Sequence, residues 1–395
     1  MTDEKTKRKL LIVSFAVTIL YALHFAVPLY TNSTFLQQFF TSSQISFLFA
    51  GAFSLTFIAS TYLSKFLHKY HNYETTLLFL TLNFFSVLLL GFVSNPIFVV
   101  LLFTSFIIFS TLLYSTINIF IEEFKGVHDI KNDNTGSVRG VFLTLLNFGI
   151  LLSPLVCSLL LTQGGFEYVY IFSALTLIPI AFLIRHFFAH IPEPKYKEVN
   201  VIGVLAKISK DRNLTGVMVA VLILEGFFAI MAVYTPLYLV NTIGLTTGQY
   251  LGVILPFALI PFVILPYELG VLADTKLGEK EMMIIGLVII LLSCAIFPFI
   301  TTKSVLVWAA FLAFSRIGAA MLEAMSYTYF FRKVHSTDVA SISLFANIRT
   351  IANAVVPAIS AVIILAGGNM MAIMITFIIC SILSVRKVLI VKDTL

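Results

Sequence analysis

Long apolar runs separated by short polar loops dominate the sequence. Each run has roughly 20 residues, which is enough for a helix to cross a hydrocarbon core of about 30 Å. The twelve predicted spans lie near residues 10–30, 45–64, 75–94, 96–121, 139–162, 168–190, 214–240, 248–270, 282–301, 304–330, 339–364 and 368–391. The pattern therefore predicts an all-α membrane protein with twelve transmembrane helices.

The composition excludes a soluble globular domain. Hydrophobic residues make up 59% of the chain and charged residues 11%, whereas soluble domains have about 25% charged residues. The amino-terminal segment MTDEKTKRK is basic and precedes an apolar stretch that is too long for the core of a signal peptide. We therefore expect this stretch to be retained as the first span.

The positive charges follow the predicted topology. With the amino terminus in the cytosol, Lys303 is the one basic residue in an external loop, and Arg316 and Arg349 lie deep inside spans. The other Lys and Arg residues fall in cytosolic loops or at the adjoining helix ends, as the positive-inside rule requires. Both termini are thus predicted to be cytosolic, and the net charge of +6 reports topology rather than a nucleic-acid partner.

The chain resembles itself at an offset of a little over 200 residues. VPLY at 27–30 matches TPLY at 235–238, and FTSSQ at 40–44 matches LTTGQ at 245–249. Chance similarity between apolar helices is the alternative explanation. Two parallel six-span repeats are a recurring design of secondary transporters. We predict an N-terminal six-helix bundle, a cytosolic linker and a C-terminal six-helix bundle over residues 1–190, 191–213 and 214–395.

A charged loop between two apolar spans points to a family. In GVLADTKLGEKE, from residue 270 to 281, the residues Gly270, Asp274, Gly278 and Lys280 resemble the cytosolic loop signature of the major facilitator superfamily (MFS). The second glycine follows the aspartate by four residues, where the family usually has three. In the first half, Lys69 stands at the position of Asp274.

Two further segments carry the same resemblance, namely RGVFLTLLNFGILLSP from 139 to 154 and SRIGAAMLEAMSYTY from 315 onward. The resemblance covers essentially the whole chain. It implies the MFS fold of two pseudo-symmetric six-helix bundles, and transport of a small molecule by alternating access.

The loop signature also implies a cytosolic gate. In the family this patch holds the two halves together when the carrier faces outward, so we predict that Asp274 contacts Arg139 in that state. An acid at a helix end can accept hydrogen bonds from a basic side chain. The alternative is that all the loop charges are solvated, and for Glu279 and Glu281 we expect solvation.

Four ionisable residues lie well inside predicted spans, and all belong to the second half: Glu225, Arg316, Glu323 and Arg349. A charge at the centre of a span costs about 2.5–3.5 kcal/mol on insertion scales, so such groups face a cavity or a partner. They are either structural ion pairs or coupling groups. On the second interpretation Glu225 carries a proton, and Arg316 is its partner or an anion contact.

The resemblance also implies which helices line the central cavity, namely the first, fourth, seventh and tenth. The candidate cavity residues are Tyr21, His24, Asn118 and Tyr234. For His24 the alternative role is that of a hydrogen-bonded packing residue. Tyrosines combine an apolar ring with a polar tip, which suits an amphipathic cavity wall.

The function we expect is proton-coupled secondary transport of a small organic molecule, with efflux of amphipathic compounds as the favoured direction. The alternatives are proton-linked uptake of a sugar or organic anion, and a non-transporting sensor. The sequence has no phosphate-binding GxxxxGK[ST] loop, and no HExxH cluster that would favour an enzyme. Cys157, Cys294 and Cys380 share no short spacing, so neither a disulfide framework nor a metal motif is supported. We also expect no cofactor. We expect a monomer in a bacterial-type inner (plasma) membrane.

Overall fold

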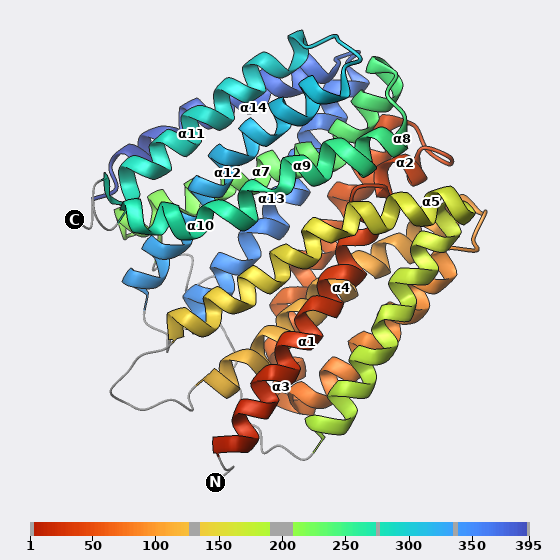
Figure 1. The fold of residues 1–395 in the computed structure, drawn as a ribbon, viewed down its shortest axis with the longest axis vertical. Helices are drawn as coiled ribbons and strands as arrows, with labels where there is room; N and C mark the ends of the chain where they lie inside the picture. Colours follow the sequence, from red (N-terminus) through yellow and green to blue (C-terminus); the bar gives the residue numbers. More distant parts are fainter. Residues whose placement is uncertain (1–3, 126–134, 190–207, 274–276, 335–338, 393–395) are drawn as a thin grey trace. The chain divides into compact units, whose positions relative to one another are not determined.

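Helices form nearly all of the part of the chain that the structure, a computed structural model, describes (Figure 1). The described residues are 4–125, 135–189, 208–273, 277–334 and 339–392. By its internal contacts the chain divides into two compact units. Unit 1 comprises Met1–Thr31 and Ile58–Glu198, and unit 2 comprises Asn32–Phe57 and Val199–Leu395.

Unit 1 contains four long helical segments. They are α1 (Glu4–Leu29), α3 (Ser42–Leu90) from Ile58 onward, α4 (Pro96–Lys125) and α5 (Thr135–Phe187). The start of α4 is encoded locally: the Asn95 side chain accepts a hydrogen bond from the backbone N–H of Ile97 at 2.9 Å, and Pro96 occupies the first turn, where its missing N–H is not needed. Within the unit, α1 packs against α4 and α5.

Two helices are long enough to cross a membrane twice. The 49-residue α3 is interrupted at His71, whose φ of 59° lies in the left-handed region, and the 53-residue α5 is interrupted at Gly164 and Gly165. In the described residues ten helices are long and apolar enough to span a membrane. Because α3 and α5 each contain two such lengths, these helices are consistent with the twelve predicted spans.

Unit 2 is organised around α7 (Arg212–Tyr238), which packs against α12 (Val305–Lys333), α13 (Val339–Leu365) and α14 (Met370–Leu389). The remaining elements of the unit are α2 (Asn32–Leu36), the first part of α3, η1 (Leu239–Ile243), α8 (Thr247–Gln249), η2 (Tyr250–Ile254), α9 (Leu255–Leu259), α10 (Pro261–Leu272), α11 (Gly278–Ile296) and η4 (Phe297–Phe299). Prolines explain the break between α9 and α10, because Pro261 has no N–H to continue the helix.

The two matching segments of the repeat have the same local structure. In FTSSQ, the backbone N–H of Thr41 donates to the Gln44 side chain at 2.9 Å, and the backbone N–H of Gln44 donates to the Thr41 hydroxyl at 3.5 Å. In LTTGQ, Thr246 and Gln249 make the same reciprocal bonds at 2.9 and 3.1 Å. Both segments are therefore capping boxes, which satisfy the first N–H groups of a helix. The sequence similarity at these positions thus reflects one repeated way of starting a helix.

Glycines bring α11 and α12 into close contact. A Cβ atom on Gly286 would lie 2.7 Å from the carbonyl oxygen of Gly318, and one on Gly318 would lie 2.7 Å from Cβ of Ile289. Any side chain at either position would force the helices apart. Small residues at helix crossings are a main source of packing energy in membranes, where no hydrophobic effect drives helices together.

Candidate functional site

The central feature of unit 2 is an ion pair between Glu225 and Arg349. Nε of Arg349 lies 3.2 Å from Oε2 of Glu225. Glu225 is the middle residue of the 27-residue α7, and Arg349 comes from α13. The Glu225 side chain is 5% exposed, whereas that of Arg349 is 47% exposed. The pair therefore joins a buried acid to a base that is open on one side.

The other two intramembrane charges lie on α12. The Arg316 side chain is buried, and its guanidinium carbon lies 5.1 Å from the ring centroid of Phe227 and 5.7 Å from that of Phe228. Aromatic faces stabilise a cation at such distances. Glu323 follows two helical turns later on the same face of α12, within electrostatic range of both Glu225 and Arg349. The structure thus gathers all four predicted charges around one stretch of α7.

This arrangement suits reversible proton binding. A buried carboxylate is stable only while a cation or a proton compensates its charge. If Arg349 moves away, Glu225 must take up a proton, and when Arg349 returns the proton must leave. A buried glutamate whose compensating arginine comes from another helix can therefore link a movement of that helix to protonation.

In unit 1 the buried polar groups form a hydrogen-bonded network around His24. His24 Nε2 lies 2.8 Å from the Asn83 amide nitrogen, and His24 Nδ1 lies 3.0 Å from the backbone oxygen of Ser173. The Ser173 hydroxyl donates to the His24 carbonyl at 2.7 Å, and the Asn83 amide donates to the Ser110 hydroxyl at 3.1 Å. These residues come from α1, α3, α4 and α5, so the network ties four segments of the unit together.

The network determines the state of the His24 ring. An amide nitrogen can only donate, so Nε2 must be the acceptor and Nδ1 must carry the hydrogen that Ser173 accepts. That is the neutral tautomer. The ring is fully buried, so in this conformation it borders no open space. The structure thus gives His24 the surroundings of a hydrogen-bonded packing residue, the alternative left open by the sequence.

The other cavity candidates also have defined partners. The Tyr21 hydroxyl donates to the backbone oxygen of Ser110 at 3.0 Å, which joins it to the His24 network. The Tyr234 hydroxyl donates to the Ser46 hydroxyl at 2.8 Å, linking α7 to the first part of α3 within unit 2. Asn118 bonds the carbonyl of Tyr114 one turn earlier on its own helix, at 2.8 Å.

The structure describes the predicted cytosolic gate only in part. Gly278 begins α11 with a φ of 72°, a conformation that a glycine adopts without strain. Gly270 lies in α10, and Lys280 lies half-buried in the first turn of α11. Asp274 and the side chain of Arg139 lie outside the described residues, so the contact between them stays a prediction.

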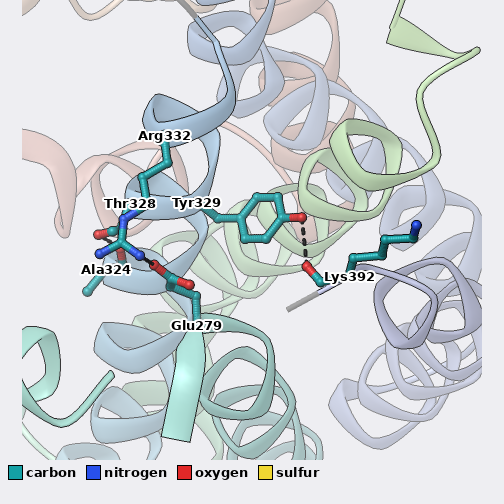
Figure 2. A network of polar contacts seen from close by, with 6 residues as sticks. All are labelled: Glu279, Ala324, Thr328, Tyr329, Arg332 and Lys392. Atoms are coloured by element: carbon teal, nitrogen blue, oxygen red, sulfur yellow. Dashed lines mark hydrogen bonds and ion pairs between the residues drawn. The ribbon is translucent and has the colours of Figure 1, made fainter. Parts of the chain in front are cut away.

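The expectation that Glu279 is solvated is wrong. Its side chain is 1% exposed and forms an ion pair with Arg332 at the end of α12 (Figure 2). The close approach of α11 to α12 brings these two helix ends together. One turn earlier on α12, Tyr329 donates to the backbone oxygen of Lys392 at 2.8 Å, which attaches the carboxyl-terminal segment to the same end of the helix (Figure 2).

Sequence reasoning missed the partners more often than the charged groups. Asn83, Ser110 and Ser173 were not singled out, although each is a polar residue inside an apolar span, which is the signal that could have found them. Phe227 and Phe228 could not be recognised as the surroundings of Arg316, because phenylalanine is common throughout the chain. In the described part of the chain no group of three or more His, Cys, Asp or Glu residues is placed to hold a metal ion.

The helical membrane fold and the charges collected inside it define a multi-pass membrane protein of the transporter class. The model of the Major Facilitator Superfamily matches residues 10–357. The chain belongs to this family, and the family and fold predicted from the sequence are confirmed. No curated protein matches the sequence.

Solved structures resemble the chain over nearly its whole length. One is a bacterial homologue of the human lysosomal transporter Spinster, in an inward-facing and unoccupied conformation, with 12% identity and a TM-score of 0.72. The match covers 99% of this chain and 95% of that one. Another is a mutant of the nucleoside transporter NupG, with 13% identity, a TM-score of 0.70, and coverage of 97% and 100%. At such identities the similarity shows a shared fold alone.

Proposed function

We propose that the protein is a proton-coupled secondary transporter that moves a small organic molecule by alternating access. Membership of the family supports a carrier rather than an enzyme, and a bacterial-type inner membrane is the proposed location. One observation carries the proton coupling: Glu225, at the middle of α7, is buried and pairs with a half-exposed arginine at 3.2 Å. A purely structural pair has no need of a base that is open on one side.

The proposed cycle uses only groups on this chain. In one state Glu225 is ionised and bound to Arg349. A shift of α13 relative to α7 separates the pair, and the carboxylate then takes up a proton, because an uncompensated charge in an apolar interior is costly. Return of Arg349 releases the proton. Each cycle thus couples one protonation of Glu225 to one conformational change.

Composition favours efflux of amphipathic compounds as the direction. The half-buried Phe228 supplies aromatic surface beside Arg316, and an apolar wall with a few polar groups is typical of a site that binds amphipathic molecules. The second candidate is proton-linked uptake of an organic anion, which the exposure of Arg349 favours. The two candidates differ in the sign of coupling: exchange for a proton in the first, cotransport with one in the second.

Purified protein in liposomes tests both the coupling and the direction. A panel of labelled organic compounds is offered under pH gradients of either sign, and accumulation is compared for the wild type and Glu225→Gln. We expect Glu225→Gln to abolish accumulation driven by the pH gradient, because an amide cannot carry the proton. Exchange of substrate between the two sides, which needs no net proton movement, should remain.

A matched control is Glu74→Gln. Glu74 is an exposed glutamate in the part of α3 that belongs to unit 1, so it is not a member of the charge cluster of unit 2, and its substitution should leave accumulation unchanged. Full pH-driven accumulation by Glu225→Gln would refute the role of Glu225 as the proton carrier.

A further inference from the structure

Arg349 is half-exposed although it lies deep within a membrane-spanning helix. Its guanidinium is held 3.2 Å from Glu225, the middle residue of α7. A free arginine near a helix end can extend toward the membrane surface, but this ion pair keeps the charge near the centre of the span. At that depth 47% of the Arg349 side chain is exposed.

The exposed side of Arg349 cannot face lipid. An arginine at the centre of a span costs about 2.5–3.5 kcal/mol even on insertion scales, and it normally faces water or a partner. The same face of α13 carries Ala346 and the half-buried Asn353, whose amide donates to the carbonyl of Arg349 at 2.9 Å. The opposite face carries the exposed apolar residues Val355, Ile359 and Val362. One face of α13 is thus suited to lipid, and the face of Arg349 is suited to water.

We propose that Arg349 binds the anionic group of the transported substrate in competition with Glu225. This inference rests on the proposed function, in which Glu225 carries the proton. The substrate anion takes the place of the Glu225 carboxylate at the guanidinium, and the released carboxylate takes up one proton at Oε2. The products are a neutral Glu225 and an arginine paired with the substrate, so one proton enters for each anion that binds.

Charge balance requires that one proton is taken up for each anion that binds. Of the charged groups inside the helices packed against α7, Arg349 of α13 pairs with Glu225, Glu323 of α12 lies within electrostatic range of it, and Arg316 of α12 lies over Phe227 and Phe228. On α14 the charges are Arg386 and Lys387, and on α11 Glu279, Lys280 and Glu281, all in turns at the ends of those helices. When Glu225 and Glu323 are both ionised, their two negative charges balance the two positive charges of Arg316 and Arg349. An anion alone would leave a net negative charge in apolar surroundings, whereas an anion with a proton leaves the sum unchanged.

The surroundings also indicate the substrate class. A guanidinium binds planar oxyanions through paired N–H donors, so carboxylates, phosphates and sulfonates are all suitable groups. Phe228, three residues after Glu225 on α7 and half-buried, offers aromatic surface to the rest of the molecule, whereas Phe227 is fully buried. The chemistry that fits is an organic monoanion with an apolar or aromatic body. The coupling that follows is cotransport with a proton, as in the second candidate function, and not the exchange for a proton of the first.

Calorimetry on the detergent-purified full chain tests the proposal. The probes are benzoate, benzenesulfonate and the neutral benzamide, each titrated in two buffers of different ionisation enthalpy, so that the proton count on binding is measured. For the wild type we expect both anions to bind, benzamide not to bind, and one proton to be taken up per anion. Glu225→Gln should bind the anions without proton uptake.

The decisive variant is the double substitution of Glu225→Gln with Arg349→Gln. It leaves no uncompensated charge at the pair, which protects folding. Compared with Glu225→Gln alone, it should bind benzoate roughly 10- to 100-fold more weakly, because a hydrogen bond to a charged group is lost.

Three results would overturn the inference: equal benzoate affinity in the double and single variants, equal affinity of the wild type for benzamide and benzoate, or no binding of either anion at millimolar concentration. Anion binding that depends on Arg349 but occurs without proton uptake by the wild type would support the anion site. That result would also refute Glu225 as the proton carrier.

Discussion

Buried polar side chains in this protein are satisfied in two different ways. Both nitrogens of the His24 ring meet neutral hydrogen-bonding groups, and the ring has no exposed surface. Glu225 is also buried, but its partner Arg349 is open on one side. A closed neutral network favours one fixed arrangement, whereas an ion pair with one open member can exchange partners. We therefore assign stability to the first group and transport to the second.

Asn83 is expected to contribute to stability, because it contacts both His24 and Ser110. Replacing it with leucine, which has a similar size, should destabilise the protein by about 1–3 kcal/mol, because His24 Nε2 and the Ser110 hydroxyl lose a buried partner. Thermal unfolding of the purified protein measures the effect. Asn118→Leu is the control, because Asn118 is partly exposed and bonds its own helix. Equal melting temperatures for the two variants would contradict a structural role for the network.

At the scale of the element, α13 has two different faces. Its apolar face and its polar face lie on opposite sides of one helix, as the spacing of Val355 and Ile359 against Arg349 and Asn353 shows. The sequence alone does not distinguish the two faces clearly, because the face with Arg349 and Asn353 also carries apolar residues such as Ala346. The ion pair identifies the polar face, because it fixes which side of α13 lies toward Glu225 of α7.

The two faces predict different chemical accessibility. In a chain whose three native cysteines are replaced, Asn353→Cys should react with a charged, membrane-impermeant methanethiosulfonate, because the reagent and the reactive thiolate both require water. Val355→Cys, two residues away, should react far more slowly in the same vesicles. Labelling rates followed by mass spectrometry give the comparison. Similar rates at both positions would show that the face of Arg349 is not hydrated.

At the scale of the whole molecule, the two units have different interiors. The charges Glu225, Arg316, Glu323 and Arg349 belong to unit 2, whereas the neutral network around His24 belongs to unit 1. The capping boxes at Thr41 and Thr246 show one helix start used twice, and both lie in unit 2. The division into bundles over residues 1–190 and 214–395 is itself still a prediction.

The predicted cytosolic gate between Asp274 and Arg139 concerns the whole molecule. Asp274→Asn should weaken the cytosolic closure and shift the carrier away from its outward-facing state, because the amide loses the charge that Arg139 binds. Transport rate and spin-label distances across the cytosolic side measure the shift. Exchanging the two residues, as Asp274→Arg with Arg139→Asp, should restore the balance. If Asp274→Asn changed neither the rate nor the distances, the gate would be refuted.

Most of the fold followed from sequence because membrane helices are specified locally. An apolar run of sufficient length must form a helix in lipid, where every backbone group needs an internal partner. The family followed from the charged loop together with two further segments, the predicted topology and the repeat. The burial of Glu279 did not follow, because its neighbour Arg332 is more than 50 residues away in the chain.

The sequence by itself determined the helical membrane class, the positions of the spans and the presence of charges that lipid would not tolerate. Only the tertiary structure decided which charges meet. It paired Glu225 with Arg349, placed Arg316 over two phenylalanine rings and enclosed His24 with Asn83, Ser110 and Ser173. The physical reason is one of range. Hydropathy acts on each segment separately, whereas an ion pair or a hydrogen bond depends on how distant helices pack.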